Sequence, residues 1–211
     1  MFITFEGIEG CGKTTQAKKL KHYLEEQNKE VVLTREPGGS KLGIELRKIL
    51  LSLENQGISK ECELFLYLAD RVEHVQQVIK PALAQGKVVI SDRYVDSTLV
   101  YQGYGRGIEL DLLYQLNALA TNNLEPNITI LLDLPVETGL KRALERNLEN
   151  KQSRQEGRFE AESLDFHQKI REGYLTLASL HPERFIVLDG SPAPEKVFAR
   201  LLEKIKNKLK F

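Results

Sequence analysis

The side chains best suited to chemistry lie in a glycine-rich run near the start of the chain. Residues 7–14 read Gly-Ile-Glu-Gly-Cys-Gly-Lys-Thr and match the pattern GxxxxGK[ST]. Glycines let backbone N–H groups turn inward around phosphate oxygens, and the start of a following helix adds positive potential. Lys13 can reach the outer phosphates, and the Thr14 hydroxyl can ligate Mg²⁺. We therefore expect a nucleoside triphosphate site here.

The alternative for this run is a glycine-rich turn with no ligand. It follows the apolar segment Phe2–Phe5 and opens a helix that carries Ala17 and Leu20, which is the context that the motif requires. An NKxD base reader and a DxxG switch are not found at suitable places, so a small phosphotransferase is favoured over a GTPase. The expected nucleotide-binding residues are Gly7, Ile8, Glu9, Gly10, Cys11, Gly12, Lys13, Thr14 and Thr15.

A second group of candidates follows the predicted strand Val88–Ser91. Asp92 stands where enzymes with this loop place the carboxylate that organises Mg²⁺, so Thr14 and Asp92 are the metal candidates. Arg93 follows at once, and a guanidinium can bridge two phosphates; the alternative is a surface ion pair. Four polar residues then lie on a predicted short helix: Ser97, Thr98, Tyr101 and Gln102.

Two further sets of residues suit an acceptor molecule. Tyr67 and Arg71 are four residues apart on a helix predicted from about Ser59 to Gln85, and a ring beside a cation suits a planar base with a carbonyl acceptor. By itself, such a pair is more often one core and one surface residue. Glu36 lies in the turn after the second strand. Arg47, taken alone, reads as a surface residue.

The elements that must position these residues alternate along the chain. Amphipathic helical stripes fill the gaps between short apolar runs, which favours an α/β fold with a parallel sheet and helices on both faces. There is no internal repeat and no linker, so residues 1–211 are expected to form a single domain. The predicted strands are Phe2–Phe5, Val31–Thr34, Val88–Ser91, Ile128–Leu132 and Phe185–Leu188.

One segment, from Glu145 to Ser163, is strongly polar. The simple interpretation is a solvated helix end and loop, which charged stretches usually are. The alternative is a mobile lid at about residues 142–160 that carries arginines over the site.

Composition excludes several classes of protein. Lys+Arg and Asp+Glu are both 30, so the balanced charge gives no support for a nucleic-acid-binding role. No apolar run approaches the ~20 residues that a membrane helix needs, and the N-terminus has no signal-peptide pattern. Cys11 and Cys62 lack a metal-ligand or disulfide spacing, which suggests a reducing, cytoplasmic compartment. Together, charge, hydropathy and cysteine content predict a cytoplasmic protein without membrane or nucleic-acid partners.

Short motifs follow one another in order along the chain. They are Phe5–Thr15, Thr34–Gly39, Asp92–Ser97, Tyr101–Gly103, Leu132–Pro135 and Gly157–Glu160. Together they resemble the thymidylate kinase family, whose members phosphorylate dTMP with ATP and Mg²⁺. The resemblance extends from Phe5 to about Gly190, and motifs in the right order are more specific than the phosphate loop alone.

The resemblance implies roles for the matching positions. The fold would be that of a P-loop nucleoside monophosphate kinase, with a five-stranded parallel sheet of order 2-3-1-4-5. A homodimer packed through helices is also implied, which gives the stripe of Leu64, Leu68 and Val72 a second place to be buried. The implied acceptor contacts are Arg93 and Arg47 on the dTMP phosphate, Tyr67, Arg71 and Thr98 on the base, Tyr101 near the sugar 2′ position and Glu9 near the sugar 3′-OH.

Two classes of this family differ in where the catalytic arginine lies. Position 10 is glycine, so the loop supplies only Lys13, and the chain resembles the bacterial class with arginines in the lid. Arg158 is the first candidate and Arg154 the second, while neither Arg146 nor Arg154 is assigned to a family position because the stretch Asn147–Glu156 looks longer than in some relatives. Lys13, Arg93, Arg158 and Glu9 are thus the expected catalytic residues, and Arg142 is a candidate wall of the adenine site.

The predicted activity is transfer of the ATP γ-phosphate to dTMP, with several arginines neutralising two anions. The alternative is another deoxynucleotide or deoxynucleoside kinase. A nucleoside acceptor would need a general base for its hydroxyl, and Glu36 is the candidate. A nucleotide sensor without catalysis is the remaining alternative, although it would not need the arginines.

Overall fold

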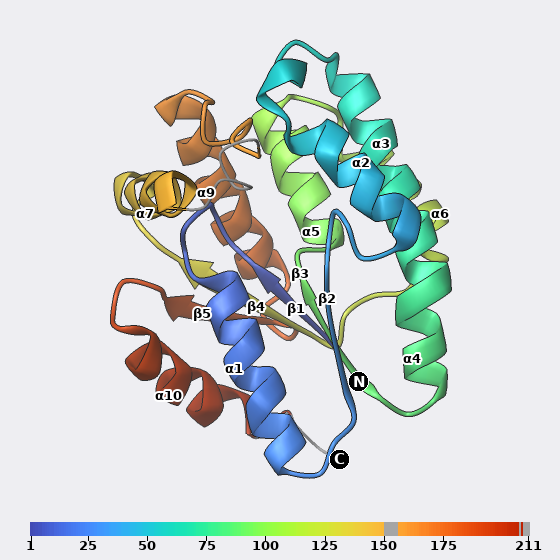
Figure 1. The fold of residues 1–211 in the computed structure, drawn as a ribbon, viewed down its shortest axis with the longest axis vertical. Helices are drawn as coiled ribbons and strands as arrows, with labels where there is room; N and C mark the ends of the chain where they lie inside the picture. The colour runs from blue at the N-terminus through green and yellow to red at the C-terminus, as the bar shows by residue number, and fades with distance from the viewer. Residues whose placement is uncertain (150–155, 207, 209–211) are drawn as a thin grey trace.

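The five strands form one parallel sheet of order β2-β3-β1-β4-β5 in the computed structural model, which describes residues 1–149, 156–206 and 208 (Figure 1). Each predicted strand is present and runs one residue beyond its predicted end. The predicted order is therefore confirmed. The strands are β1 (Phe2–Glu6), β2 (Val31–Arg35), β3 (Val88–Asp92), β4 (Ile128–Asp133) and β5 (Phe185–Asp189).

Helices connect the strands and cover the sheet. Serine side chains cap three of them at the N-terminus: Ser40, Ser59 and Ser163 each accept from a backbone N–H three residues on. The helices are α1 (Lys13–Glu26), α2 (Lys41–Leu51), the short 3₁₀ helix η1 (Leu53–Asn55), α3 (Lys60–His74), α4 (Lys80–Ala84), α5 (Val95–Thr98), α6 (Leu110–Thr121), α7 (Val136–Glu149), α9 (Leu164–Leu180) and α10 (Pro194–Ile205).

Two π-helical segments interrupt this regular pattern. The segment η2 (Val75–Ile79) joins α3 to α4, so the helix predicted from about Ser59 to Gln85 is continuous in space. The segment η3 (Leu99–Gly105) continues α5 and carries Tyr101 and Gln102. Single π turns are rare and often occur at functional sites, which fits the second segment.

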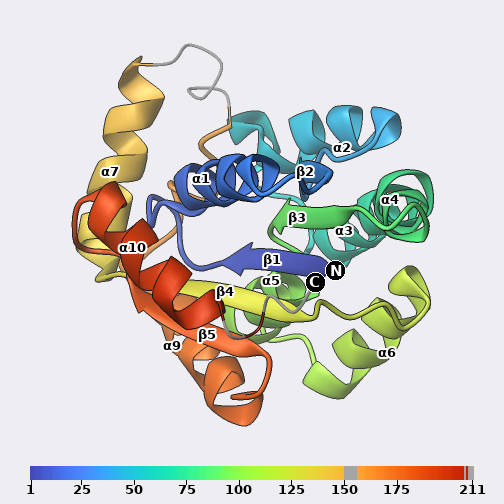
Figure 2. The ribbon, with the colours of Figure 1, turned by 90° about the horizontal axis from the view of Figure 1, so that it is seen from below.

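The helices form a layer on each side of the sheet. Figure 2 shows α1 and α10 on one side, and α4, α6 and α9 on the other. Helix α1 contacts α10 and the central strands, whereas α9 contacts β4 and β5. Alternate residues of β1 therefore face opposite layers, and Phe2, Ile3 and Phe5 are each at most 1% exposed.

The parallel register brings the polar strand ends together. Phe5 pairs with Asp92 on β3 and with Ile130 on β4, so the carboxyl ends of β1, β3 and β4 lie at the same edge of the sheet. Ligands of open α/β sheets bind at this edge. Within the described ranges, we find no helix long and apolar enough to cross a membrane.

The stripe on α3 is divided between core and surface. Leu64 and Leu68 are buried in the core of this chain, while Val72 is 38% exposed. Leu64 and Leu68 are thus already buried within this chain, and of the three residues only Val72 is exposed enough to need a second burial site. Phe65, at 62% exposed, and Val72 present the outer apolar face of the helix instead.

Candidate active site

The phosphate loop joins β1 to α1 at the carboxyl edge of the sheet. Gly12 caps α1 with a left-handed φ of 98°, and Lys13 opens the helix. The Lys13 Nζ donates to the carbonyls of Gly7 at 3.0 Å and Ile8 at 2.8 Å. These oxygens hold the ammonium over the loop, where it can meet a phosphate.

Position 10 is restricted by α7. Gly10 has a φ of 68°, and a Cβ built there would lie 2.0 Å from the carbonyl oxygen of Gly139. An arginine or lysine at this position would push α7 away from the loop. The close approach of α7 therefore explains why position 10 is glycine and carries no basic side chain.

The two metal candidates meet beside the loop. The Thr14 hydroxyl donates to Asp92 Oδ2, joining the start of α1 to the end of β3. Hard oxygen ligands of this kind suit Mg²⁺. The described residues offer no group of three His, Cys, Asp or Glu side chains able to hold a metal. A cation here would therefore complete its coordination with phosphate and water oxygens, as Mg²⁺ in such sites does.

Arg93 lies at the centre of the site. Its backbone is left-handed, with a φ of 74°, a conformation that costs energy for a non-glycine residue and is concentrated at functional sites. Its guanidinium donates to the carbonyl of Gly7 at 3.1 Å, and to Glu9 Oε1 at 2.9 Å and the Tyr101 hydroxyl at 3.0 Å. Burial disfavours the charge, but the surrounding tyrosine and glutamate oxygens raise the pKa of Arg93 well above its ordinary value.

A second set of oxygens behind Arg93 was missed in the sequence. Glu6 accepts hydrogen bonds from Ser97 Oγ and the Tyr174 hydroxyl, both at 2.7 Å, and Tyr174 also accepts from Arg93 at 3.0 Å. Burial, aided by the negative charge of Asp96, raises the pKa of Glu6 to about 7. The only sequence signal was a polar residue on the apolar face of α9.

Arg71 is almost fully committed to the protein. It is 1% exposed and donates from Nε to Glu36 and from Nη1 to Thr98 Oγ1 and Asn117 Oδ1. Nη2 donates to the carbonyl of Tyr94 at 3.1 Å. A guanidinium has five N–H groups, so one N–H on Nη2 is left over from the bonds made with described residues. Tyr67 and Arg71 both line the site cavity, as the predicted base pocket requires.

Glu36 holds Arg71 in place through a buried ion pair. Its Oε2 accepts from Arg71 at 2.8 Å, and its Oε1 lies 2.9 Å from His74 Nδ1. Although burial works in the opposite direction, Arg71 and His74 hold the pKa of Glu36 below its ordinary value. A carboxylate of this kind is a weak base.

Arg47 is a second cation on the acceptor side. Its Nη2 lies 2.6 Å from Glu156 Oε2, and its Nη1 donates to the carbonyl of Pro37 at 3.1 Å. This pair joins α2 to Glu156. Glu156 belongs to residues 142–160, the segment predicted to be a lid and called the lid segment below. The sequence alone indicated a surface residue, but the Arg47 side chain is only 20% exposed.

The arginines of the lid segment differ in position. Arg158 is 2% exposed: Nη1 lies 2.6 Å from Glu63 Oε2, and Nε donates to the carbonyl of Leu50. It is not among the cavity-lining residues, whereas Arg146 is. Arg154 lies outside the described residues. Arg142, the predicted wall of the adenine site, donates to the carbonyls of Gly190 and Ser191.

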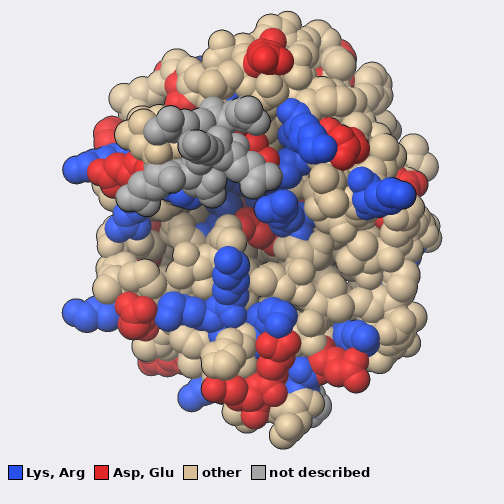
Figure 3. All heavy atoms as spheres, in the orientation of Figure 1, with Lys and Arg blue, Asp and Glu red and all other residues tan. Residues whose placement is uncertain are grey.

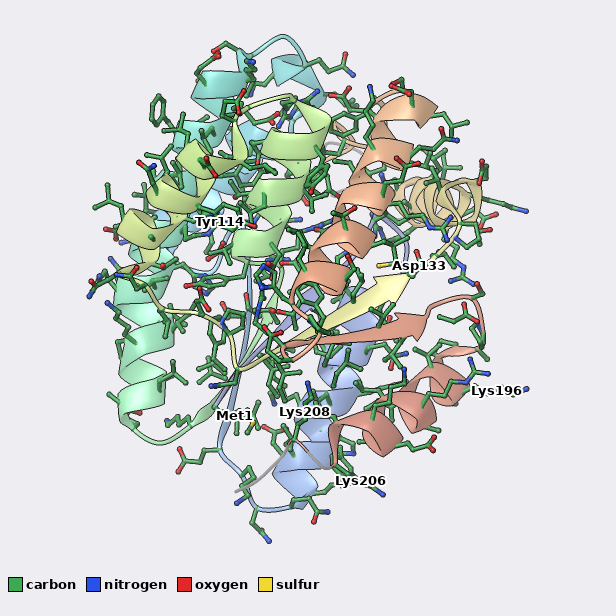
Figure 4. All side chains as sticks on the ribbon, turned by 180° about the vertical axis from the view of Figure 1, so that it is seen from behind. Met1, Tyr114, Asp133, Lys196, Lys206 and Lys208 are labelled. Atoms are coloured by element: carbon green, nitrogen blue, oxygen red, sulfur yellow. The ribbon has the colours of Figure 1, made fainter. Side chains whose placement is uncertain are left out.

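Lys13, Arg93 and the acceptor-side residues line one cavity of about 660 Å³. Figure 3 shows Lys and Arg side chains gathered around a hollow on the face seen in Figure 1. On the other side of the molecule, Asp133 ends β4 and accepts a bidentate pair from Arg171 of α9, which ties that helix to the sheet (Figure 4). The expected site residues that line the cavity are Glu9, Gly10, Lys13, Thr14, Glu36, Arg47, Tyr67, Arg71, Asp92, Arg93, Ser97, Thr98, Tyr101 and Gln102.

Known proteins resemble this chain over its whole length. The family model "Thymidylate kinase" matches residues 5–201. A thymidylate kinase of Maridesulfovibrio salexigens is 56% identical over 210 residues, covering 100% of this chain and 97% of the relative. One of Oleidesulfovibrio alaskensis is 58% identical over 201 residues, covering 95% of each.

A solved structure agrees with these relatives. The crystal structure of thymidylate kinase from Ehrlichia chaffeensis has a TM-score of 0.76 and 37% sequence identity, and the match covers 97% of this chain and 98% of that one. Sequence and fold thus give the same answer as the phosphate loop and the arginines that line the cavity beside it. The chain belongs to the thymidylate kinase family.

Proposed function

We propose that this enzyme transfers the γ-phosphate of ATP to the phosphate of dTMP, giving ADP and dTDP. An oxygen of the dTMP phosphate forms a bond to the γ-phosphorus, and the bond from that phosphorus to the β–γ bridging oxygen breaks. The observation that carries the proposal is that one cavity joins the phosphate loop, Arg93 and a base pocket in which Arg71 keeps one N–H that no described residue uses. Membership of the family supports the same reaction.

The donor side would bind the triphosphate of ATP. The Lys13 ammonium would exchange the loop carbonyls for phosphate oxygens, and the backbone N–H groups of the loop would surround them. Thr14 and Asp92 would hold Mg²⁺, which supplies charge neutralisation for the phosphates when it is bound. We propose the adenine ring beside Arg142.

The acceptor side would need arginines and no general base. The second pKa of a phosphate monoester is about 6, so dTMP is mostly a dianion at neutral pH. The obstacle is the approach of two anions, which Arg93 and Arg47 can neutralise. Arg47 would leave Glu156 for the phosphate, an exchange of one anionic partner for another.

Thymine recognition would depend on the remaining N–H of Arg71. A donor in this position matches a carbonyl such as O4 of thymine, whereas cytosine presents an amino group there, which leaves the donor unpaired. Tyr67 would contact the ring face, with Thr98 and Gln102 nearby. Tyr101 would crowd the sugar.

The lid segment would supply a further cation at the transferred phosphate. Arg146 is the candidate that supports this role best, because it lines the cavity and its side chain is 56% exposed. We keep Arg158 as a second candidate: it would have to leave Glu63 before it could act. Closure of this segment would also limit hydrolysis of ATP by water.

The protein is proposed to work as a cytoplasmic homodimer. Helices α3 and α6 contact each other and carry exposed apolar side chains, among them Phe65 at 62% and Leu119 at 80%. Tyr114, labelled in Figure 4, lies on α6 and is 41% exposed. Both cysteines are free thiols, which suits a reducing compartment.

Release of ADP from Mg·ATP should be measured with a panel of acceptors: dTMP, dUMP, dCMP, dGMP, AMP, UMP and thymidine. We expect the highest kcat/KM with dTMP, a lower one with dUMP, which lacks the methyl group, and little turnover of dCMP. Lys13→Met is the control for contaminating kinases, because it removes the loop cation and should abolish all turnover.

Two results would contradict the proposal. Turnover of thymidine but not of dTMP would mean that the protein is a deoxynucleoside kinase. Because Glu36 is a weak base, another residue would then have to act as the general base for the thymidine hydroxyl. No turnover of any acceptor by a folded protein that binds ATP would favour a nucleotide sensor.

A further inference from the structure

A buried histidine without a hydrogen-bond partner among the described residues lies beside Glu9 of the phosphate loop. His167, on α9, is 1% exposed, and neither Nδ1 nor Nε2 makes a hydrogen bond to a described residue. Buried polar atoms are nearly always hydrogen-bonded, so an unpaired imidazole needs an explanation. The other buried histidine, His74, has partners on both ring nitrogens, Thr34 and Glu36.

The atom that His167 faces is also unpaired. Its Nδ1 lies 3.5 Å from Glu9 Oε2, and this oxygen has no hydrogen-bond partner within the described part of the chain. The other oxygen of the same carboxylate, Oε1, accepts from Arg93 at 2.9 Å and from Tyr101 at 2.5 Å. Two unpaired polar atoms thus face each other at the edge of the reaction centre.

We propose that His167 is a positioning residue: its Nδ1–H donates to Glu9 Oε2 and fixes the carboxylate that aligns Arg93 and Tyr101. The distance needs to shorten by about half an ångström to reach an ordinary hydrogen bond. Catalytic hydrogen bonds are often long without substrate and tighten when it binds. An Nδ1–H donor is available in both the neutral and the cationic imidazole, so the proposal does not depend on titration.

The charges around this pair favour an ionised Glu9. Arg93 and Lys13 act on Glu9 from the acceptor side and the phosphate loop, whereas repulsion between Glu9 and Glu160 acts in the opposite direction. Burial raises the pKa of Glu9, but His167, Arg93 and Lys13 together hold it below its ordinary value. A buried carboxylate with a free oxygen can rotate, and a donor from α9 removes this freedom.

The consequence for catalysis depends on the proposed function. Arg93 is the candidate cation between the two phosphates, and Glu9 Oε1 is one of the acceptors that orient it. Loss of the His167 donor should therefore leave Arg93 poorly aligned with the dTMP phosphate. Because Arg93 also bonds Gly7 and Tyr174, it should remain in the site.

The first test reads the imidazole directly and needs no activity. The chain has four histidines, His22, His74, His167 and His181, so ¹⁵N spectra of the ring nitrogens can be assigned by single variants. We expect His167 to have a protonated Nδ1, and Glu9→Ala to remove or shift that signal. An unprotonated Nδ1, or a signal that Glu9→Ala leaves unchanged, would overturn the proposal.

The second test separates the donor from packing. The amide of Asn can place an N–H near the position of Nδ1, whereas Phe fills similar space without a donor. His167→Phe should lower kcat/KM for dTMP about tenfold, in line with a hydrogen bond to a charged group, and His167→Asn should restore most of it. KM for ATP should change little, and His181→Asn, at the end of the same helix, should match the wild type.

Equal losses in His167→Phe and His167→Asn would assign the residue to packing and overturn the proposal. Melting temperatures of all variants would show whether any loss reflects unfolding. If the wild-type protein does not phosphorylate dTMP, the proposed function fails, while the ¹⁵N spectra still decide whether His167 donates to Glu9.

Discussion

At the scale of single residues, the site depends on how each arginine is held. Arg93 donates to oxygens of Gly7, Glu9 and Tyr101. The bonds that Arg71 makes with described residues leave one of its N–H groups for a ligand. Arg158, in contrast, is buried against Glu63, and both side chains are 1% exposed. Three arginines that the sequence assigned to the site are therefore held in different ways.

This difference gives a prediction for two arginines of the lid segment. Arg158→Ala removes one partner of a buried ion pair, although Glu63 keeps Arg106 and Gln102, so the free energy of unfolding should fall by roughly 2–4 kcal/mol. Arg146→Ala should barely change stability but should lower kcat by ~10³-fold if it neutralises the transferred phosphate. Chemical unfolding and kcat at a temperature below both transitions would measure the two effects.

Conservative variants refine the comparison. Arg158→Lys should recover part of the stability because a cation stays beside Glu63. If Arg158→Ala lowers kcat as much as Arg146→Ala at full folding, Arg158 leaves Glu63 during the reaction and is the catalytic arginine that the sequence indicated.

At the scale of elements, two helices deliver most of the residues that support the site. One face of α9 carries His167, Arg171 and Tyr174. His167 contacts Glu9 of the phosphate loop, Arg171 contacts Asp133 at the end of β4, and Tyr174 accepts a hydrogen bond from Arg93. Helix α3 carries Asp70 and Arg71. Asp70 Oδ1 accepts from the backbone N–H of Gly38, which ties the loop after β2 to α3.

Asp70 should make the stability depend on pH. Burial first, and the charge of Glu36 second, raise the pKa of Asp70 from 3.8 to about 6. Between these values the folded state binds more protons than the unfolded state, so the free energy of unfolding contributed by Asp70 falls as pH rises. Asp70→Asn cannot ionise, and above pH ~6 it should be more stable than the wild type by roughly 2–3 kcal/mol.

Unfolding curves of both proteins at a series of pH values would measure this difference. Asp165→Asn, an equal change of charge at an exposed position, is the control and should leave the pH profile unchanged. A difference between Asp70→Asn and the wild type that does not vary with pH would show that Asp70 titrates normally.

At the scale of the whole molecule, the outer face of α3 and α6 is the candidate subunit interface. The protein should behave as a particle of twice the chain mass of 24.0 kDa. Phe65→Lys should yield the monomer, because an unpaired charge in an apolar interface loses its hydration. Leu180→Lys is the matched control on α9: Leu180 and Phe65 are both 62% exposed. Sedimentation of the three proteins would decide, and identical masses for the two variants would refute this interface.

The sequence by itself determined the elements and the phosphate-binding chemistry. Strand positions follow from short apolar runs, and the loop from Gly7 to Thr14 is specified by a local spacing, so both can be recognised without knowledge of distant contacts. Asp92 and Arg93 could be found for the same reason, because Asp92 ends a recognisable strand and Arg93 follows it.

The tertiary structure alone decided what lies behind these residues. Glu6 and Tyr174 are 168 residues apart, and the partners Arg158 and Glu63 are 95 apart, so no local pattern relates them. Arg158 shows the consequence: its motif indicated a lid, but Leu50 and Glu63 hold it inside the protein. Local spacing specifies which chemistry is available, whereas the direction of a side chain depends on buried partners that only folding brings together.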